Sequence, residues 1–217
     1  MDRFLEAPRV IFQVGPIPIT ETVVNSWIVM VVMAVVSWAV TRRLSRSPGS
    51  IQNMVEMVVE SLRELVSSTM GDRANGFAPY MGTLALYLFF ANASGVLGLR
   101  PPTSDLNITL GMALLTFILI HMMGFKAKKA GYLKDFAQPV ILFLPLNILG
   151  ELAKPVSLSF RLFGNILGGS IILAMVYASV PVAVPVPLHL YFDIFVGLLQ
   201  SFIFVMLTMV FVALAME

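Results

Sequence analysis

One arginine lies within a long apolar stretch of this chain. Between residues 136 and 192 the charged residues are Glu151, Lys154 and Arg161 only. A guanidinium keeps its proton at physiological pH, and placing it in the middle of a membrane span costs about 2.5 to 3.5 kcal/mol on insertion scales. Two explanations are open: an ion pair within the chain, or an arginine that faces a partner's carboxylate or a water-filled path. The second is favoured, and the acids available for the first are Glu151, Asp193 and Asp105.

Polar and small residues share a helical stripe with Arg161. Asn165 and Gly168 follow it at i+4 and i+7, the spacing that keeps side chains on one face. Gly164 and Gly169 are also small enough to let another helix approach closely within a membrane. A charge beside a smooth surface suits a partner that slides past it.

The last apolar segment has a similar stripe, formed by Asp193, Gly197 and Gln200. An acid in the outer third of a span is costly unless it is hydrated or paired, so Asp193 is predicted to lie on an ion path. Gln200 has the alternative role of a hydrogen bond between helices. His189, at the predicted outer mouth, is either a proton carrier or an interfacial anchor.

Motifs for other chemistry are missing from the sequence. It has no cysteine, no HExxH, no GxSxG and no phosphate loop, which leaves metal, hydrolase and nucleotide chemistry without support. An intramembrane enzyme that pairs Ser94 with His121 is a remaining hypothesis, although the glycine-flanked serine motif is absent. We therefore expect no cofactor and no protein-held metal, and the net charge of +2 is too small to indicate nucleic-acid binding.

Composition predicts an integral membrane protein. The chain is 58% hydrophobic and 12% charged, whereas soluble domains carry about a quarter of charged residues. Uncharged runs of membrane-spanning length occupy 23–40, 80–99, 107–125 and 194–216. Residues 51–70 instead have helical periodicity, with apolar side chains on one face and mostly acidic ones on the other. This pattern predicts a helix along the inner membrane surface, with a packed soluble helix as the alternative.

The stretch around Arg161 has two interpretations: residues 136–150 form a separate short span, or one long helix continues to about residue 177. Length favours the second, because 145–178 would be about 50 Å long against a hydrocarbon core of about 30 Å. The final segment, 188–217, is overlong as well. Since excess length is absorbed by tilt, we predict two oblique helices joined by the proline-rich turn 181–187.

The predicted fold class is therefore an all-α integral membrane protein of a single domain, with five membrane-embedded helices and one amphipathic surface helix. The predicted segments are the outer N-terminal segment 1–21, the spans 22–41, 79–99 and 107–125, the surface helix 50–74, and the oblique helices 140–179 and 187–217. The stretches 41–79 and 126–139 hold nine Lys and Arg residues, against three on the opposite side. This asymmetry predicts an outside N-terminus and a cytoplasmic C-terminus.

Residues 145–165, PLNILGELAKPVSLSFRLFGN, resemble the signature of the a subunit of F-type ATP synthases. The stretches 101–107 and 199–208, and His121 with Gly124, resemble further blocks of that family, so the similarity extends from about residue 77 onward. The span count, the surface helix and the oblique hairpin agree with the family's fold.

The resemblance implies a mechanism. Arg161 would face a rotating ring of c subunits, whose ion-binding carboxylates are reached through two offset aqueous half-channels. It would hold each passing carboxylate deprotonated and block a direct leak. Asn165 and Gln200 would be its polar partners, and Ser157, Glu151 and His189 would lie on the ion pathway. The resemblance also implies peripheral-stalk b subunits and lipid as partners, a bacterial plasma membrane, and no enzyme activity of the chain alone.

The sequence departs from the family pattern in the outer half-channel. Where many relatives carry a paired Glu and His, this chain has Ser170 and Asp193, which leaves one ionisable group. These two residues either line a proton path through water or offer oxygen ligands to Na⁺, a hard cation. H⁺ is preferred. The alternative function, a self-contained secondary transporter, would require repeated halves, and the sequence has no internal repeat.

Overall fold

The computed structural model describes residues 8–42, 49–71, 76–129, 131–132, 136, 141–179 and 184–217. Within these ranges, five helical stretches are long and apolar enough to cross a membrane. They are α1 (Glu21–Thr41), α3 (Ala78–Ala93) with its 3₁₀ continuation Ser94–Leu97, α4 (Leu106–Lys128), α6 (Leu144–Ser179), and the stretch Pro185–Met216. The prediction of an all-α membrane protein is confirmed.

The stretch Pro185–Met216 has three parts. It begins with α7 (Pro185–His189), continues as a π-helix over Leu190–Val196, and ends with α8 (Gly197–Met216). A π-helix forms its backbone hydrogen bonds between residues five apart and is frequently found at functional sites. Hydropathy does not distinguish a π-helix from an α-helix, so the sequence did not predict this segment.

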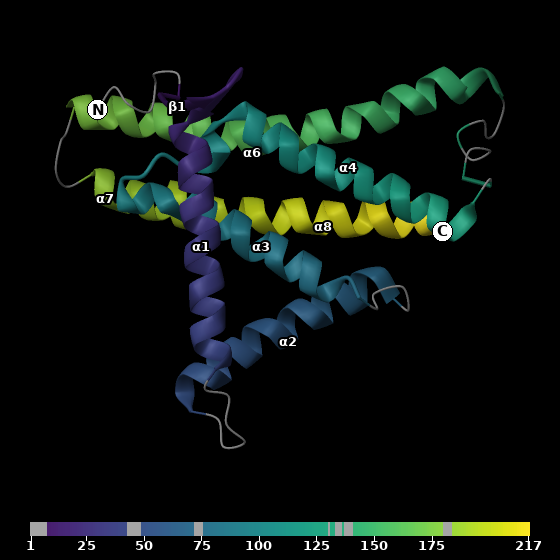
Figure 1. Ribbon diagram of the computed structural model, residues 1–217, viewed down its shortest axis with the longest axis horizontal. Coiled ribbons are helices and arrows are strands. Elements are labelled where there is room, and N and C mark those ends of the chain that lie inside the picture. Colours follow the sequence, from purple (N-terminus) through teal and green to yellow (C-terminus); the bar gives the residue numbers. More distant parts are fainter. Residues whose placement is uncertain are drawn as a thin grey trace.

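Helix α6 is a single element of 36 residues, about 54 Å long, so residues 144–150 do not form a separate span. In Figure 1, α6 and α8 run across the molecule while α1 descends steeply past them. If α1 crosses a bilayer roughly perpendicular to it, the axes of α6 and α8 make a large angle with the bilayer normal. Their lengths and the direction of α1 therefore agree with an oblique hairpin.

Two helices have a C-terminal end that differs by more than two residues from the predicted one. The surface helix α2 (Ser50–Met70) ends at Met70 rather than at residue 74, and Gly71 adopts a positive φ of 59°; residues 72–75 lie outside the described residues. Helix α4 continues to Lys128 rather than stopping at residue 125. Its last turn contains Lys126 and Lys128, and cations favour the negative end of a helix dipole, so the helix extends past the apolar run.

The N-terminal segment contains a β-hairpin that the sequence analysis did not predict. Strand β1 (Val10–Val14) pairs antiparallel with β2 (Ile17–Thr20), and Val14 lies opposite Ile17. The intervening two-residue turn begins with Gly15 at φ 62°, the conformation that a tight hairpin turn requires. Pro16 and Pro18 obscured this pattern, because proline is unfavourable inside a sheet but tolerated in a two-stranded edge.

The helices pack around two apolar clusters. One joins α2, α3, α4 and α8, and the other joins α3, α4, α6 and α8; the buried members are Val66, Met70, Met81, Ile120, Val205, Met209 and Val212 in the first, and Leu88, Ala113, Leu158, Leu162 and Phe204 in the second. Helix α2 reaches the first cluster only through its last turns. The apolar side chains of its first half, including Ile51, Met54 and Met57, stay exposed, as a membrane-surface helix requires.

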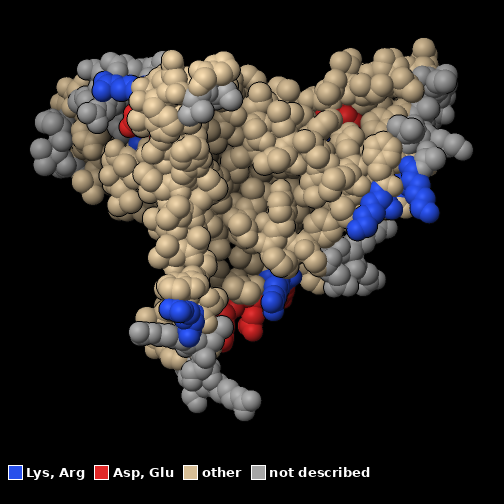
Figure 2. All heavy atoms as spheres, viewed as in Figure 1, with Lys and Arg blue, Asp and Glu red and all other residues tan. Residues whose placement is uncertain are grey.

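Charged side chains gather at the edges of the molecule. Figure 2 shows a face that is almost free of charge over α1, α4 and α6, with acidic and basic side chains beside α2, basic side chains near the end of α4, and a few charged side chains near the start of α1. At the end where α1 begins, buried hydrogen bonds tie the helices together: Thr22 donates to the Asp105 carboxylate at 2.7 Å, and Asn25 donates to the carbonyl of Arg100 at 2.9 Å.

Candidate functional site

Arg161 lies on the exposed side of α6, and its guanidinium makes no hydrogen bond or ion pair with any described residue. The three acids that could have neutralised it are engaged elsewhere. Glu151 pairs with Lys154, Asp193 bonds His189 at 2.7 Å, and Asp105 accepts from Thr22. The explanation by an ion pair within the chain is therefore wrong for the part of the chain that the structure describes.

The surface around Arg161 is open. A Cβ added at Gly164 or Gly168 would meet nothing within 4 Å, and Asn165 is also exposed. Gly169 differs, because a Cβ there would lie 3.1 Å from the ring of Phe192. Gly169 thus serves the contact between the two arms of the hairpin, while Gly164 and Gly168 leave a smooth face beside the arginine.

Gln200 reaches this face from the other arm. The Asn165 amide donates to the Gln200 carbonyl oxygen and links α6 to α8 next to Arg161. Gln200 is 3% exposed, and among the described residues its Nε2 has no hydrogen-bond partner. A buried amide donor without a partner costs free energy, so this group is available to donate to a partner beyond the described residues.

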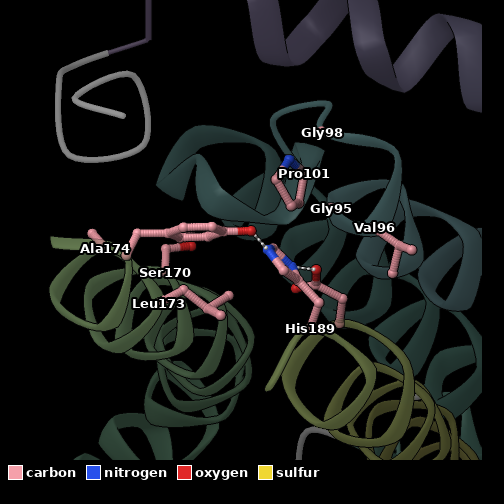
Figure 3. A pocket seen from close by; sticks show the side chains of 10 residues that line it. Gly95, Val96, Gly98, Pro101, Ser170, Leu173, Ala174 and His189 are labelled. Carbon is pink, nitrogen blue, oxygen red and sulfur yellow. Dashed lines mark hydrogen bonds and ion pairs between the residues drawn. The ribbon is translucent and has the colours of Figure 1, made fainter. Parts of the chain in front are cut away.

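A cavity of about 360 Å³ lies between α6, the α7 end of the other arm, and the turn after α3. Ser170 and Tyr177 line it from α6, and His189 and Asp193 line it from the opposite arm (Figure 3). The Tyr177 hydroxyl and His189 Nε2 share a hydrogen bond of 2.9 Å, and His189 Nδ1 shares one of 2.7 Å with Asp193 Oδ2. The hydroxyl of Ser170 donates to the carbonyl of Ile166.

The conclusion that one ionisable group remains here is wrong. The fold places His189 one helical turn before Asp193 and brings Tyr177 across from α6, so a phenol, an imidazole and a carboxylate form one hydrogen-bonded chain. The i, i+4 spacing of His189 and Asp193 could have indicated the pair. No sequence signal pointed to Tyr177, which approaches only because the two arms pack together.

Helix α3 and its continuation hold the π-helical segment in place through small residues. A Cβ at Gly95 would lie 2.8 Å from the Asp193 carboxylate, and one at Gly197 would lie 2.9 Å from Asn92. Asn92 donates to the carbonyl of Gly197 at 3.2 Å, and Thr103 donates to Asn92 at 2.6 Å. The contacts of Gly95, Asn92 and Thr103 were missed, because their partners lie far away in the sequence or across a turn, and Gly197 was noted only as part of the stripe with Asp193 and Gln200.

Replacing Gly95 with alanine is expected to displace the Asp193 side chain and destabilise the protein by about 1 to 3 kcal/mol, as overpacking does. Thermal unfolding of the purified protein in detergent would measure this loss. Gly111→Ala is the matched control, because a Cβ at Gly111 meets nothing within 4 Å and alanine is the better helix former. An unchanged midpoint for Gly95→Ala would contradict the close contact.

Two further cavities lie on the other side of Arg161 along α6. The larger, about 500 Å³, is lined by Asn147, Glu151 and Lys154 together with residues at the ends of α4 and α8. The smaller, about 240 Å³, is lined by Ser157 and Arg161. Ser157, predicted toward the inner half-channel, and Glu151, predicted on the ion pathway, line these two cavities, whereas Ser170, His189 and Asp193 line the first cavity, on the predicted outer side.

The hypothesis of a Ser94 and His121 enzyme site is wrong. Ser94 donates to the carbonyl of Ala91 near the turn that follows α3, at 2.7 Å. His121 bonds the carbonyl of Phe117 near the far end of α4, where it packs against Tyr132 and Phe136. Ile120, next to His121, packs in one cluster with Met81 near the start of α3, whereas Ser94 follows the end of that helix, so the two side chains lie apart.

Known proteins match almost the whole chain. Residues 23–213 match the family model of the ATP synthase A chain. The chain is 37% identical over 208 residues to ATP synthase subunit a of Moorella thermoacetica, covering 95% of each, and 40% identical over 207 residues to ATP synthase subunit a 2 of a Bradyrhizobium species, covering 94% and 92%. It is 37% identical over 212 residues to the sodium ion specific ATP synthase subunit a of Propionigenium modestum, covering 90% of this chain and 73% of the relative. The resemblance noted in the sequence is confirmed, and the chain belongs to the family of ATP synthase a subunits.

Proposed function

We propose that this chain is the ion-translocating stator subunit of a rotary F-type ATP synthase, and that Arg161 faces the carboxylates of a c-subunit ring. One observation carries the proposal: an exposed arginine, without a partner among the described residues, lies on α6 between a cavity near the end of that helix and another near its start. A charge in an apolar span is costly unless an opposite charge or water compensates it. A rotating ring that brings one carboxylate after another past Arg161 would supply that opposite charge.

The mechanism follows from electrostatics. An ion enters through the outer cavity and neutralises a ring carboxylate near Asn165 and Gln200. When rotation brings a loaded carboxylate toward Arg161, the fixed positive charge favours the ionised form, so the ion leaves into the inner cavities. The same charge repels a cation moving directly from one cavity to the other, which prevents a leak.

We propose H⁺ as the coupling ion. The outer cavity is lined by an imidazole and a phenol, and histidine is the side chain best suited to accept and release protons near neutral pH. Na⁺ is the second candidate, because Ser170 and Asp193 offer oxygen atoms in that cavity and one relative is named as sodium ion specific. The chain is about equally similar to relatives without that designation.

The proposed setting is a bacterial plasma membrane with the N-terminus outside and the C-terminus in the cytoplasm. The basic residues at the ends of α1 and α4, Arg42, Lys126 and Lys128, would then lie on the cytoplasmic side, as the positive-inside rule requires. Helix α2 would lie along that surface, and peripheral-stalk b subunits and lipid would cover the remaining apolar faces. The chain would bind no nucleotide itself.

Reconstitution separates this function from that of a self-contained transporter. Liposomes that contain the purified chain alone are expected to show no H⁺ or Na⁺ flux under an imposed gradient, because the carrier carboxylates belong to the ring. Liposomes that contain the chain together with the ring and the b subunits are expected to conduct. Flux through the chain alone, saturating with ion concentration, would instead favour a transporter.

A further inference from the structure

The two inner cavities adjoin along a shared part of their walls, which we call the neck. Gly150, Lys154 and Phe211 are common to both linings. Beyond the neck on one side lies the wall that contains Arg161, and on the other lies the wall that contains Glu151. Gly150 has no side chain, so Lys154 and Phe211 supply the side chains at the neck. An ion that travels between the cavities passes these two residues.

Lys154 is held in position at this neck. Its Nζ pairs with Glu151 Oε1 at 2.5 Å and lies over the ring of Phe211, 5.1 Å from its centroid. The side chains of Lys154 and Glu151 are 30% and 23% exposed. Long lysine side chains otherwise lose considerable rotamer entropy when they are fixed, so two separate contacts at one site indicate a defined position rather than a free surface lysine.

Glu151 presents a spare acceptor. Its second oxygen, Oε2, is buried and has no hydrogen-bond partner in the part of the chain that is described. The neck therefore combines a fixed cation with a carboxylate that has one oxygen engaged and one available. The other titratable groups in the two walls are Lys128 and Tyr132 in the larger cavity and Arg161 in the smaller.

We propose that Lys154 is the charge filter of the inner path. Its positive charge opposes the passage of free metal cations and other cationic solutes between the two cavities, while Glu151 passes protons through its available oxygen. This inference rests on the proposed function, because it takes the inner cavities as a path from the cytoplasm to Arg161. It adds to that function a selectivity step within this chain, separate from the binding site on the ring.

A single cysteine beyond the neck can report on the filter. The chain has no cysteine, so Ser157→Cys introduces one thiol into the wall of the smaller cavity. The complete ATP synthase in inside-out vesicles is treated with cationic, neutral or anionic thiosulfonates. Mass spectrometry of this chain then gives the rate at which each reagent modifies the thiol. With Lys154 present, the cationic reagent is expected to react more slowly than the neutral one.

Charge changes at the neck should then shift the rates in opposite directions. Lys154→Gln is expected to raise the cationic-to-neutral rate ratio about tenfold or more, the scale on which a charged cleft alters local ion concentration. Glu151→Gln should lower that ratio and raise the anionic one, because the carboxylate no longer offsets part of the lysine charge. Gly150→Leu is the size control: a Cβ there meets open space, so a larger side chain should slow all three reagents alike.

Two outcomes would overturn the proposal at different levels. If Lys154→Gln leaves the ratio of cationic to neutral rates unchanged while the thiol still reacts from the inner side, the filter is wrong and the inner path stands. If the thiol reacts only from the outer side, or with no reagent in any variant, the inner path itself is wrong, and with it this part of the proposed function.

Discussion

Replacing Arg161 with alanine is expected to abolish ATP synthesis driven by an ion gradient while the complex still assembles in the membrane. Arg161 is exposed and makes no hydrogen bond or ion pair with a described residue, and such substitutions usually change stability by less than about 0.5 kcal/mol. What disappears is the charge that makes a ring carboxylate release its ion. Rotation without release transports nothing.

The measurement is ATP synthesis by membrane vesicles at a fixed gradient, normalised to the amount of assembled complex. Passive ion conductance should persist in the variant, because the charge that blocks a direct leak is gone. Arg42→Ala is the matched control: that arginine stacks on Trp38 at the end of α1, away from the cavities, and synthesis should be normal. Normal synthesis by Arg161→Ala would remove the mechanism.

Replacing Asp193 with asparagine should slow ion entry from the outer side, on the order of 100-fold if the carboxylate acts as a positioned proton-transfer group. Asparagine has nearly the same shape, but it can neither ionise nor complete proton transfer with His189, which lies 2.7 Å away. Tyr177→Phe should have a smaller effect, because it removes only the far end of the hydrogen-bonded chain.

This prediction is measured as the synthesis rate over a range of outside pH and outside Na⁺. A proton path makes the defect of Asp193→Asn depend on pH and leaves it indifferent to Na⁺, whereas dependence on Na⁺ would identify sodium as the coupling ion. Ser179→Ala, at the exposed end of α6, serves as the control and should leave the rate unchanged. Unchanged rates for Asp193→Asn in every condition would exclude it from the path.

The long helices show which features of the fold hydropathy can predict. The span lengths, the continuity of the helix that carries Arg161 and the amphipathic character of residues 50–70 all depend on neighbours within a few turns, and the structure contains each of them. The N-terminal hairpin and the π-helical segment were missed, because both depend on pairing or packing with residues outside the local pattern.

The sequence by itself determined the membrane class, the helix lengths and Arg161 as the residue that requires a partner, because apolar periodicity and an isolated charge are properties of a single stretch of chain. The pairs of Glu151 with Lys154 and of Asp193 with His189 lie within single helical stretches, at i,i+3 and i,i+4. Only the tertiary structure decided that Asp105 accepts a hydrogen bond from Thr22. The same is true of the contact of Tyr177 with His189 and of Gly95 with Asp193. These pairs join separate elements, and their distances are set by how the helices pack, which no local pattern encodes.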